Sequence, residues 1–368
     1  MTIPLDPKSQ IQWPVNEEFS LEFQRLLGAA QEGGAMVAEC FLVAGLIDPD
    51  DYSDSWHREW MRIADLSRER ADAAFARGHV STAQGNWLRA INYYQASTFA
   101  LDAGEKWRAA VGAMRACARR YIAHLAPAGE VVEIPWLEGH ALEGYFLPAA
   151  GNSDRAPVIV CIGDPGHRKE EYLFKVARHA RERGVSLLAV DLLGSGTDSE
   201  FDEVIGRPGL ETSVSSVMDY LTTRDDVDER RIAVLGDGAG SSFVARGVAL
   251  DNRFAAVVCD GGIWDMHEHA FLMNRLSQNG AGDGGFARGW PVRRFHCPVL
   301  ITMGGQGWLE SGIVAGLFER LKARHPGISL KIFESSETAA AQGHCDNPTL
   351  ANEFIFDWVA DRFESIAA

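Results

Sequence analysis

The sequence predicts an α/β protein with a mainly parallel sheet and a helical region at its N-terminal end. After residue 129, short apolar runs such as PVIVCIG, VSLLAVD and RIAVLGD alternate with helix-like segments. That alternation is typical of βαβ units, whose parallel strands are buried on both faces. Between residues 17 and 126, apolar residues instead recur three and four positions apart, which indicates helices. With 368 residues, 46% of them hydrophobic, the chain is long enough for one large domain and an accessory one.

We therefore place a helical cap region at residues 1–128 and an α/β domain at residues 129–368. Within the second region, VVEIPWLEG and HALEGYFLPA read as a hairpin that precedes the parallel strands. The glycine-rich stretch at 279–285 lacks the preceding strand and the Lys-Ser/Thr of a phosphate-binding loop. We expect it to belong to a lid or cap segment at 265–292, and the active cleft to lie between the helical cap and the sheet.

Composition narrows the classes of partner. A formal net charge of −16 opposes non-specific attraction to nucleic acid or to anionic membranes, so a small-molecule substrate is expected. The sequence shows neither a signal-peptide pattern nor an apolar run long enough to span a bilayer, which predicts a cytoplasmic protein. Its six cysteines lack CxxC spacing and are expected to be reduced thiols, and we expect no metal and no cofactor.

The strongest local signal is the segment RIAVLGDGAG, in which a strand runs into a turn of small residues and then a helix. Ligands of parallel sheets bind beyond the carboxyl ends of the strands, and this is the setting of the G-x-S-x-G nucleophile elbow. The five elbow positions are Gly236, Asp237, Gly238, Ala239 and Gly240. Gly238 occupies the apex, where serine normally stands, and offers no oxygen to acylate.

Residues 129–368, together with the helical N-terminal region and the segment GDPGHRKEE, resemble the α/β-hydrolase superfamily. Within it the chain is similar to the group of 2,6-dihydroxypseudooxynicotine hydrolase, fungal polyketide-shortening pigment hydrolases and fermentation-respiration-switch-type esterases. The resemblance implies an α/β-hydrolase fold with a helical cap, a Ser-Asp-His triad, an oxyanion hole and, often, hydrolysis of a carbon–carbon bond next to a ketone. It also implies a homodimer.

The triad carries over only in part. The acid of the family follows the penultimate strand, where PVLITMGGQG places Gly307, so that position is vacant as well. The histidine is retained as His344 in the stretch GHCDNP. An oxyanion hole needs only backbone donors, which the amides near Asp164 to Gly166 and at Ala239 can supply.

Other residues at the strand ends are candidates for the remaining roles. Asp260 and Asp265 follow the next strand along the chain and are candidate partners of His344. The resemblance implies a functional glutamate in the region of Glu268, for which a solvated helix face is the alternative. His167 and Asp237 are candidate substrate contacts. A metal site in WDMHEH is disfavoured, because the two rings of HxH on a helix lie about 200° apart.

Three functions remain open at this point. The leading hypothesis is a non-hydrolytic enzyme of specialised metabolism, a lyase, cyclase or isomerase, that promotes cyclisation, aldol-type closure, dehydration or isomerisation of a carbonyl-rich, polyketide-like or aromatic substrate. His344 would move protons as general acid or base near neutral pH. The second is a carbon–carbon bond or ester hydrolase that uses water activated by His344, or a hydrolase with Asp237 or Ser241 as nucleophile. The third is a catalytically inactive pseudo-hydrolase that binds a ligand or partner.

Overall fold

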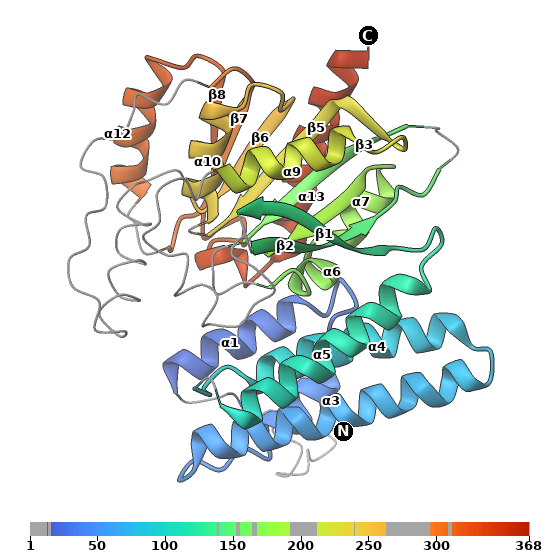
Figure 1. Cartoon of the computed structure of the whole chain (residues 1–368). Helices are drawn as coiled ribbons and strands as arrows, with labels where there is room; N and C mark the ends of the chain where they lie inside the picture. Colours follow the sequence, from blue (N-terminus) through green and yellow to red (C-terminus); the bar gives the residue numbers. More distant parts are fainter. Residues whose placement is uncertain are drawn as a thin grey trace, which may run out of the picture. The chain divides into compact units, whose positions relative to one another are not determined.

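The computed structural model describes residues 13, 16–102, 104–137, 140–151, 155–163, 168–191, 212–238, 240–262, 295–307 and 311–367 (Figure 1). The chain divides into two compact units, Met1–His124 and Leu125–Ala368.

The first unit is helical. Its elements are α1 (Glu17–Gly28), α2 (Val37–Ala44), α3 (Tyr52–Ala76), α4 (Val80–Ser97) and α5 (Glu105–Ala123). The helix α3 buries residues at helical spacing, among them Trp56, Trp60 and Ile63, against α4. Asn16 caps α1 by accepting hydrogen bonds from the amides of Glu18 and Phe19.

Large aromatic residues form the core of this unit. Trp56, Trp60, Trp87, Tyr93 and Tyr94 are all fully buried. Several of their polar atoms have partners: the indole of Trp56 donates to the carbonyl of Ala96 at 2.8 Å, and the hydroxyl of Tyr94 donates to Asp65 at 2.6 Å. The buried indole nitrogen of Trp60 has no hydrogen-bond partner among the described residues. The aromatic side chains that mark the sequence of this region therefore serve packing.

The second unit is an eight-stranded sheet in the order β1-β2-β4-β3-β5-β6-β7-β8, flanked by helices. Its strands are β1 (Glu130–Leu137), β2 (His140–Leu147), β3 (Ala156–Ile162), β4 (Ser186–Val190), β5 (Val227–Asp237), β6 (Ala256–Asp260), β7 (Val299–Gly304) and β8 (Ile328–Phe333). Its helices are α6 (Glu171–Lys175), α7 (Ala177–Glu182), α9 (Thr212–Thr222), α10 (Gly240–Leu250), α12 (Ser311–Lys322), the short 3₁₀ helix η2 (Gln342–His344) and α13 (Pro348–Ala367). The predicted hairpin β1–β2 is antiparallel, β2 also pairs antiparallel with β4, and the other pairs are parallel.

The two faces of the sheet are covered by different helices. The side chains of Val234, Val257 and Ile301 belong to one large apolar cluster with residues of α9, α10 and α12. Because successive side chains of a strand point to opposite faces, the alternate residues of β5, β6 and β7 point to the other face. There α13 packs against α7, β5 and β6. This second face carries the polar residues described next.

All six cysteines are thiols, and five of them are buried. Within the described ranges, none of the helices combines the length and the apolarity that crossing a bilayer requires.

Candidate functional site

Three polar residues form a row across the carboxyl ends of neighbouring strands. Asp237 at the end of β5 is in register with Asp260 at the end of β6, and Asp260 is in register with Thr302 of β7. All three point away from the large apolar cluster, and their exposed fractions are only 3%, 4% and 0%. Two carboxylates thus lie side by side on adjacent strands, whose spacing is about 4.8 Å. Two carboxylates this close disfavour each other's charged form, and neighbouring cations compensate for this repulsion.

The elbow backbone beside this row is fixed although its apex has no side chain. Gly238 has a positive φ of 57°, and its amide donates to the carbonyl of Asp260 at 2.7 Å. The buried hydroxyl of Ser241 bonds to two carbonyls, those of Gly236 at 2.8 Å and Asp260 at 3.0 Å. This hydroxyl therefore ties β5 to β6 and is not presented as a nucleophile.

The loop that carries the histidine is held tightly against β7. Asp346 accepts hydrogen bonds from the amides of Ala340 and Ala341, both at 3.0 Å. A Cβ atom on Gly304 would lie only 2.3 Å from the carbonyl oxygen of Ala341, so the loop approaches as closely as glycine allows. Thr338, Ala339 and His344 all have positive φ. Such strain in non-glycine residues persists only where surrounding contacts impose it.

His344 lies at the end of this loop, is 2% exposed and contacts Asp260. Its Nε2 is 2.8 Å from Asp260 Oδ1, and its Nδ1 is 2.6 Å from the carbonyl oxygen of Ala339. Both partners are acceptors, so both ring nitrogens must carry protons to make these bonds. Burial by itself would lower the pKa of His344, but the charge of Asp260 and the two hydrogen bonds raise it. The pair is thus an imidazolium and a carboxylate.

Asp260 is stabilised in its charged form. Burial by itself would raise its pKa, but His344, the charge of Lys175 and the hydroxyl of Thr302 lower it. The Thr302 hydroxyl donates to the same oxygen as His344, Oδ1, at 2.9 Å. The other oxygen, Oδ2, has no hydrogen-bond partner among the residues described. Oδ1 is therefore held in place by two hydrogen bonds, while Oδ2 can still accept one.

Lys175, which sequence reasoning missed, completes the row. It is the last residue of the short helix α6, and its ammonium group forms an ion pair with Asp237. Burial would lower the pKa of Lys175, but the charges of Asp237 and Asp260 raise it. Its carbonyl accepts a hydrogen bond from Asn352 of α13 at 2.9 Å. No sequence motif marks this lysine, because only the folded sheet brings α6 to the ends of β5 and β6.

A second buried cluster of charges surrounds Lys169, which precedes α6. It includes Asp191, the residue that follows β4. The ammonium group of Lys169 is 2.6 Å from Asp191, 2.9 Å from Glu143 and 3.4 Å from Glu170, and its side chain is fully buried. The amide of Lys169 donates to Asp191 as well, at 2.7 Å. Tyr145 donates its hydroxyl to Glu170 at 2.7 Å. Burial and the charge of Glu170 raise the pKa of Asp191, although Lys169 acts to lower it.

The remaining predicted site residues fall into two groups. Gly307 lies in the turn after β7, where its amide donates to the carbonyl of Gly304 at 3.1 Å. As the sequence shows, this position supplies no carboxylate. The others lie outside the residues that the structure describes, as does the expected lid at 265–292: Asp164, Gly166, His167, Ala239, Asp265 and Glu268.

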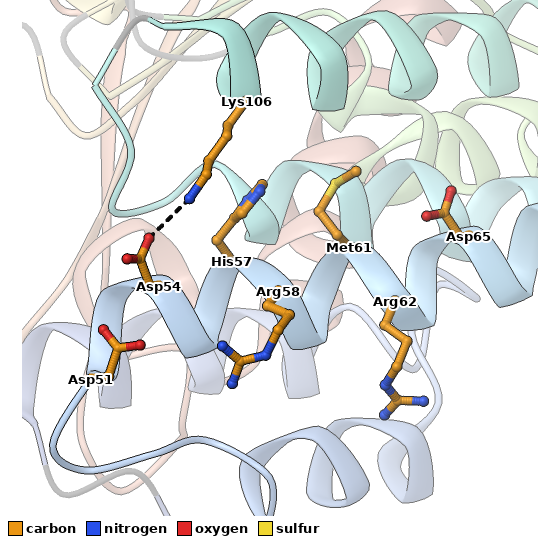
Figure 2. A pocket seen from close by; sticks show the side chains of 8 residues that line it. All are labelled: Asp51, Asp54, His57, Arg58, Met61, Arg62, Asp65 and Lys106. Carbon is orange, nitrogen blue, oxygen red and sulfur yellow. Dashed lines mark hydrogen bonds and ion pairs between the residues drawn. The ribbon is translucent and has the colours of Figure 1, made fainter.

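The helical unit has a surface hollow of about 610 Å³ (Figure 2). Its lining is Asp51, Asp54, His57, Arg58, Met61, Arg62, Asp65 and Lys106. The charged side chains form ion pairs, for example Lys106 with Asp54 at 3.1 Å and Arg62 with Glu59 at 2.9 Å. Lys106 and Asp54 are both 62% exposed, so water screens the interaction between them.

Comparison with known proteins identifies the family. The model for FrsA-like esterases matches residues 51–279. The chain belongs to the FrsA-like esterase family. Its curated relatives include the hydrolyase poxO of Penicillium oxalicum, 29% identical over 84% of this chain, and the hydrolase LUC6 of a Fusarium species, 34% identical over 66%. A third is the 20-hydroxy-prefusarin hydrolase FUS2 of Gibberella moniliformis, 31% identical over 66%. The chain spans 70%, 60% and 60% of the length of these three proteins.

Solved structures of the same architecture cover nearly the whole chain. The 2,6-dihydroxy-pseudo-oxynicotine hydrolase matches with a TM-score of 0.71 and 19% identity, over 91% of this chain and 95% of that one. AbyA5 matches with a TM-score of 0.61 and 15% identity, over 96% and 95%. At these identities the likeness shows the fold alone. Together with the family match, it confirms the α/β-hydrolase fold and the resemblance on which the sequence analysis relied.

Proposed function

We propose that this FrsA-like protein is an enzyme that works without a serine nucleophile and uses the pair Asp260–His344 for acid/base chemistry on a carbonyl-containing small molecule. The reactions that fit are cyclisation, aldol-type closure, dehydration and isomerisation. One observation carries the proposal: His344 directs Nε2 to Asp260 Oδ1 at 2.8 Å, next to an elbow whose apex is Gly238.

The chemistry follows from which atoms of the site can still accept or donate a proton. Acyl transfer requires a hydroxyl and a ring nitrogen that accepts its proton, and neither is present at the elbow. Asp260 Oδ2 can accept a proton from a carbon next to a carbonyl group. When Asp260 takes this proton, the negative charge passes to the substrate as an enolate. His344, which already carries both protons, keeps its positive charge at the site. A base with a low pKa suits a carbon flanked by two carbonyls, because such protons are unusually acidic.

The names of the relatives support a small, hydroxylated substrate. One relative is called a hydrolyase, and two similar proteins are named for 20-hydroxy-prefusarin and 2,6-dihydroxy-pseudo-oxynicotine. Loss of water from a β-hydroxy ketone begins with removal of a proton from the carbon next to the carbonyl group, and the hydroxyl group then leaves as water. The reverse aldol step begins with removal of the hydroxyl proton, after which the carbon–carbon bond breaks and the enolate takes up a proton. Neither reaction needs a covalent intermediate.

The first experiment tests for a nucleophile. The protein is treated with an alkyl fluorophosphonate and its intact mass is measured, with an ordinary serine esterase as the positive control. We expect no adduct on this protein. An adduct would reveal a nucleophile and overturn the proposal.

A second experiment tests the acid/base role with 4-hydroxy-4-phenylbutan-2-one in D₂O. Dehydration gives a conjugated enone, the reverse aldol step gives benzaldehyde, and exchange alone introduces deuterium next to the ketone. We expect at least one of these at a rate above background, and its loss in Asp260→Asn. Asp361→Asn, an exposed change on α13, is the control. Equal rates in the protein and in Asp260→Asn would contradict the assignment.

A second candidate is hydrolysis by water that Asp260–His344 activates, which the hydrolase names of the relatives favour. Hydrolysis places an oxygen atom from solvent in the product, whereas dehydration and aldol-type steps do not. Labelled water followed by mass spectrometry of the product separates the two candidates.

A further inference from the structure

The ends of β5 and β6 carry four charges in alternating order. Lys175 pairs with Asp237, Asp237 lies beside Asp260 in register, and Asp260 pairs with His344. Asp260 interacts with both cations, His344 and Lys175. Each outer cation thus compensates one of two adjacent anions.

We propose that Lys175 and Asp237 form a positioning pair whose two opposite charges set how firmly the pair Asp260–His344 holds its proton. The biological relevance of this inference rests on the proposed function, but the electrostatic coupling itself does not. Asp237 adds negative charge beside Asp260 and favours the imidazolium, whereas Lys175 adds positive charge and opposes it.

The charged groups around this row come from several elements. His344 is influenced by Asp260 of β6 and by Lys175 of α6, which acts to lower its pKa. Lys175 is influenced by Asp237 of β5, Asp260 of β6 and Glu171 of its own helix. Thr302 of β7 contributes a neutral hydroxyl.

The position of Lys175 suits such a role. Its carbonyl is tied to Asn352 of α13, which fixes the end of α6 beside the sheet. Asp237 is 3% exposed, so water screens its charge poorly. A change of charge at either residue therefore alters the electrostatic potential at Asp260 on the neighbouring strand.

The two charges predict opposite effects on His344. Lys175→Met removes the positive charge that opposes the imidazolium, so His344 should keep its proton to higher pH. Asp237→Asn removes a negative charge beside Asp260, so His344 should lose its proton at lower pH. The double variant removes one charge of each sign and should titrate close to the parent protein. A residue that acts only through packing would not give this reversal of sign.

The test is an NMR titration of the full chain with ¹⁵N-labelled histidine. The signal of His344 among the 11 histidines is assigned by its loss in His344→Gln. We expect the apparent pKa to rise by on the order of 1 unit in Lys175→Met, to fall by a similar amount in Asp237→Asn, and to return in the double variant. Shifts of the same sign in both single variants, or no shift, would overturn the proposal.

Lys175→Arg keeps the charge and protects the test against misfolding of Lys175→Met. We expect its His344 titration within about 0.3 units of the parent protein, because arginine stays protonated. A shift as large as that of Lys175→Met would show that the charge is not the cause. If the titrations behave as expected but no acid/base turnover is found, the proposed function fails while the coupling stands.

Discussion

His344 and Asp260 are joined through Nε2 of the imidazole, while Nδ1 is bound to the backbone. In a Ser-His-Asp triad the carboxylate binds Nδ1, which leaves Nε2 for the serine. Here the nitrogen that would serve a nucleophile is used by the carboxylate, and the residue at the nucleophile position is Gly238. The two features agree: Gly238 supplies no hydroxyl, and both ring nitrogens of His344 are bound to acceptors.

Gly238→Ser should therefore restore a hydroxyl without restoring an esterase. Nε2 and Nδ1 already donate to Asp260 and Ala339, so the new hydroxyl meets no nitrogen acceptor. We expect hydrolysis of p-nitrophenyl acetate by the variant to stay within about tenfold of the parent rate, that is, within about 1.4 kcal/mol in activation free energy. A larger gain, accompanied by fluorophosphonate labelling at residue 238, would show that the ring turns to serve the serine.

The ion pair predicts a pH-dependent stability difference. The pKa of His344 is raised from its ordinary 6.5, so its stabilisation is complete below that pH and is lost as the pH rises through the folded-state value. The pKa of Asp260 is lowered from 3.8, so its stabilisation is present above that pH and is lost on further acidification.

His344→Gln should accordingly destabilise the protein most between about pH 4 and 6.5. Removing one partner of a buried pair typically costs about 3–5 kcal/mol. Urea unfolding of parent and variant at pH 5.5 and pH 9 measures the difference, which should shrink at the higher pH. A difference that is the same at both values would mean that the pair carries no net charge interaction.

Gly304→Ala should displace the histidine loop. The added Cβ would lie 2.3 Å from the carbonyl oxygen of Ala341, which is backbone and cannot turn aside. We expect a loss of about 1–3 kcal/mol in the free energy of unfolding, with a changed NMR signal of His344. The matched control is Gly112→Ala in α5, where a Cβ meets no atom within 4 Å. That exposed helical change should instead stabilise by about 0.5–1 kcal/mol.

Asp346→Ala should loosen the same loop from its other side. It removes the acceptor of the amides of Ala340 and Ala341, at an expected cost of about 1–3 kcal/mol. Asp361→Ala, an exposed residue of α13, is the control and should change stability by less than about 0.5 kcal/mol. Hydrogen exchange at residues 338–344 should speed up in Asp346→Ala alone, and unchanged protection there would contradict the role given to Asp346.

Lys169→Met should be strongly destabilising at neutral pH. It leaves Asp191, Glu143 and Glu170 without their shared cation, and breaking a buried ionic cluster costs about 3–5 kcal/mol. The pKa of Asp191 is already raised from 3.8, so this group takes up a proton more readily in the folded than in the unfolded chain. Stability lost in the variant should therefore be partly recovered as the pH falls toward 4.5, which thermal unfolding at several pH values can measure.

Periodicity and strand-end position predicted much of the architecture and part of the site. Apolar runs separated by helical segments indicated the sheet, because a parallel strand buried on both faces must be apolar throughout. His344 was found through its motif, and Asp260 was one of two candidates because it ends a strand. Lys175 and Lys169 were not found, since a lysine in a short helix or in the turn before it gives no periodic signal. Their partners Asp237 and Asp191 lie at the ends of strands distant in sequence. Which nitrogen of His344 faces Asp260 depends on side-chain rotation, which no sequence pattern encodes.

The in-register row of Asp237, Asp260 and Thr302 makes the surroundings of His344 depend on the alignment of the strands. A shift of β6 by one residue would turn Asp260 toward α10 and bring Cys259 or Gly261 to its place, because neighbouring residues of a strand point to opposite faces. His344 would then face no carboxylate, and Asp237 no neighbour of like charge. The titration of a single imidazole thus reports whether the central strands have paired correctly, and a refolding experiment can follow the assembly of the sheet through it.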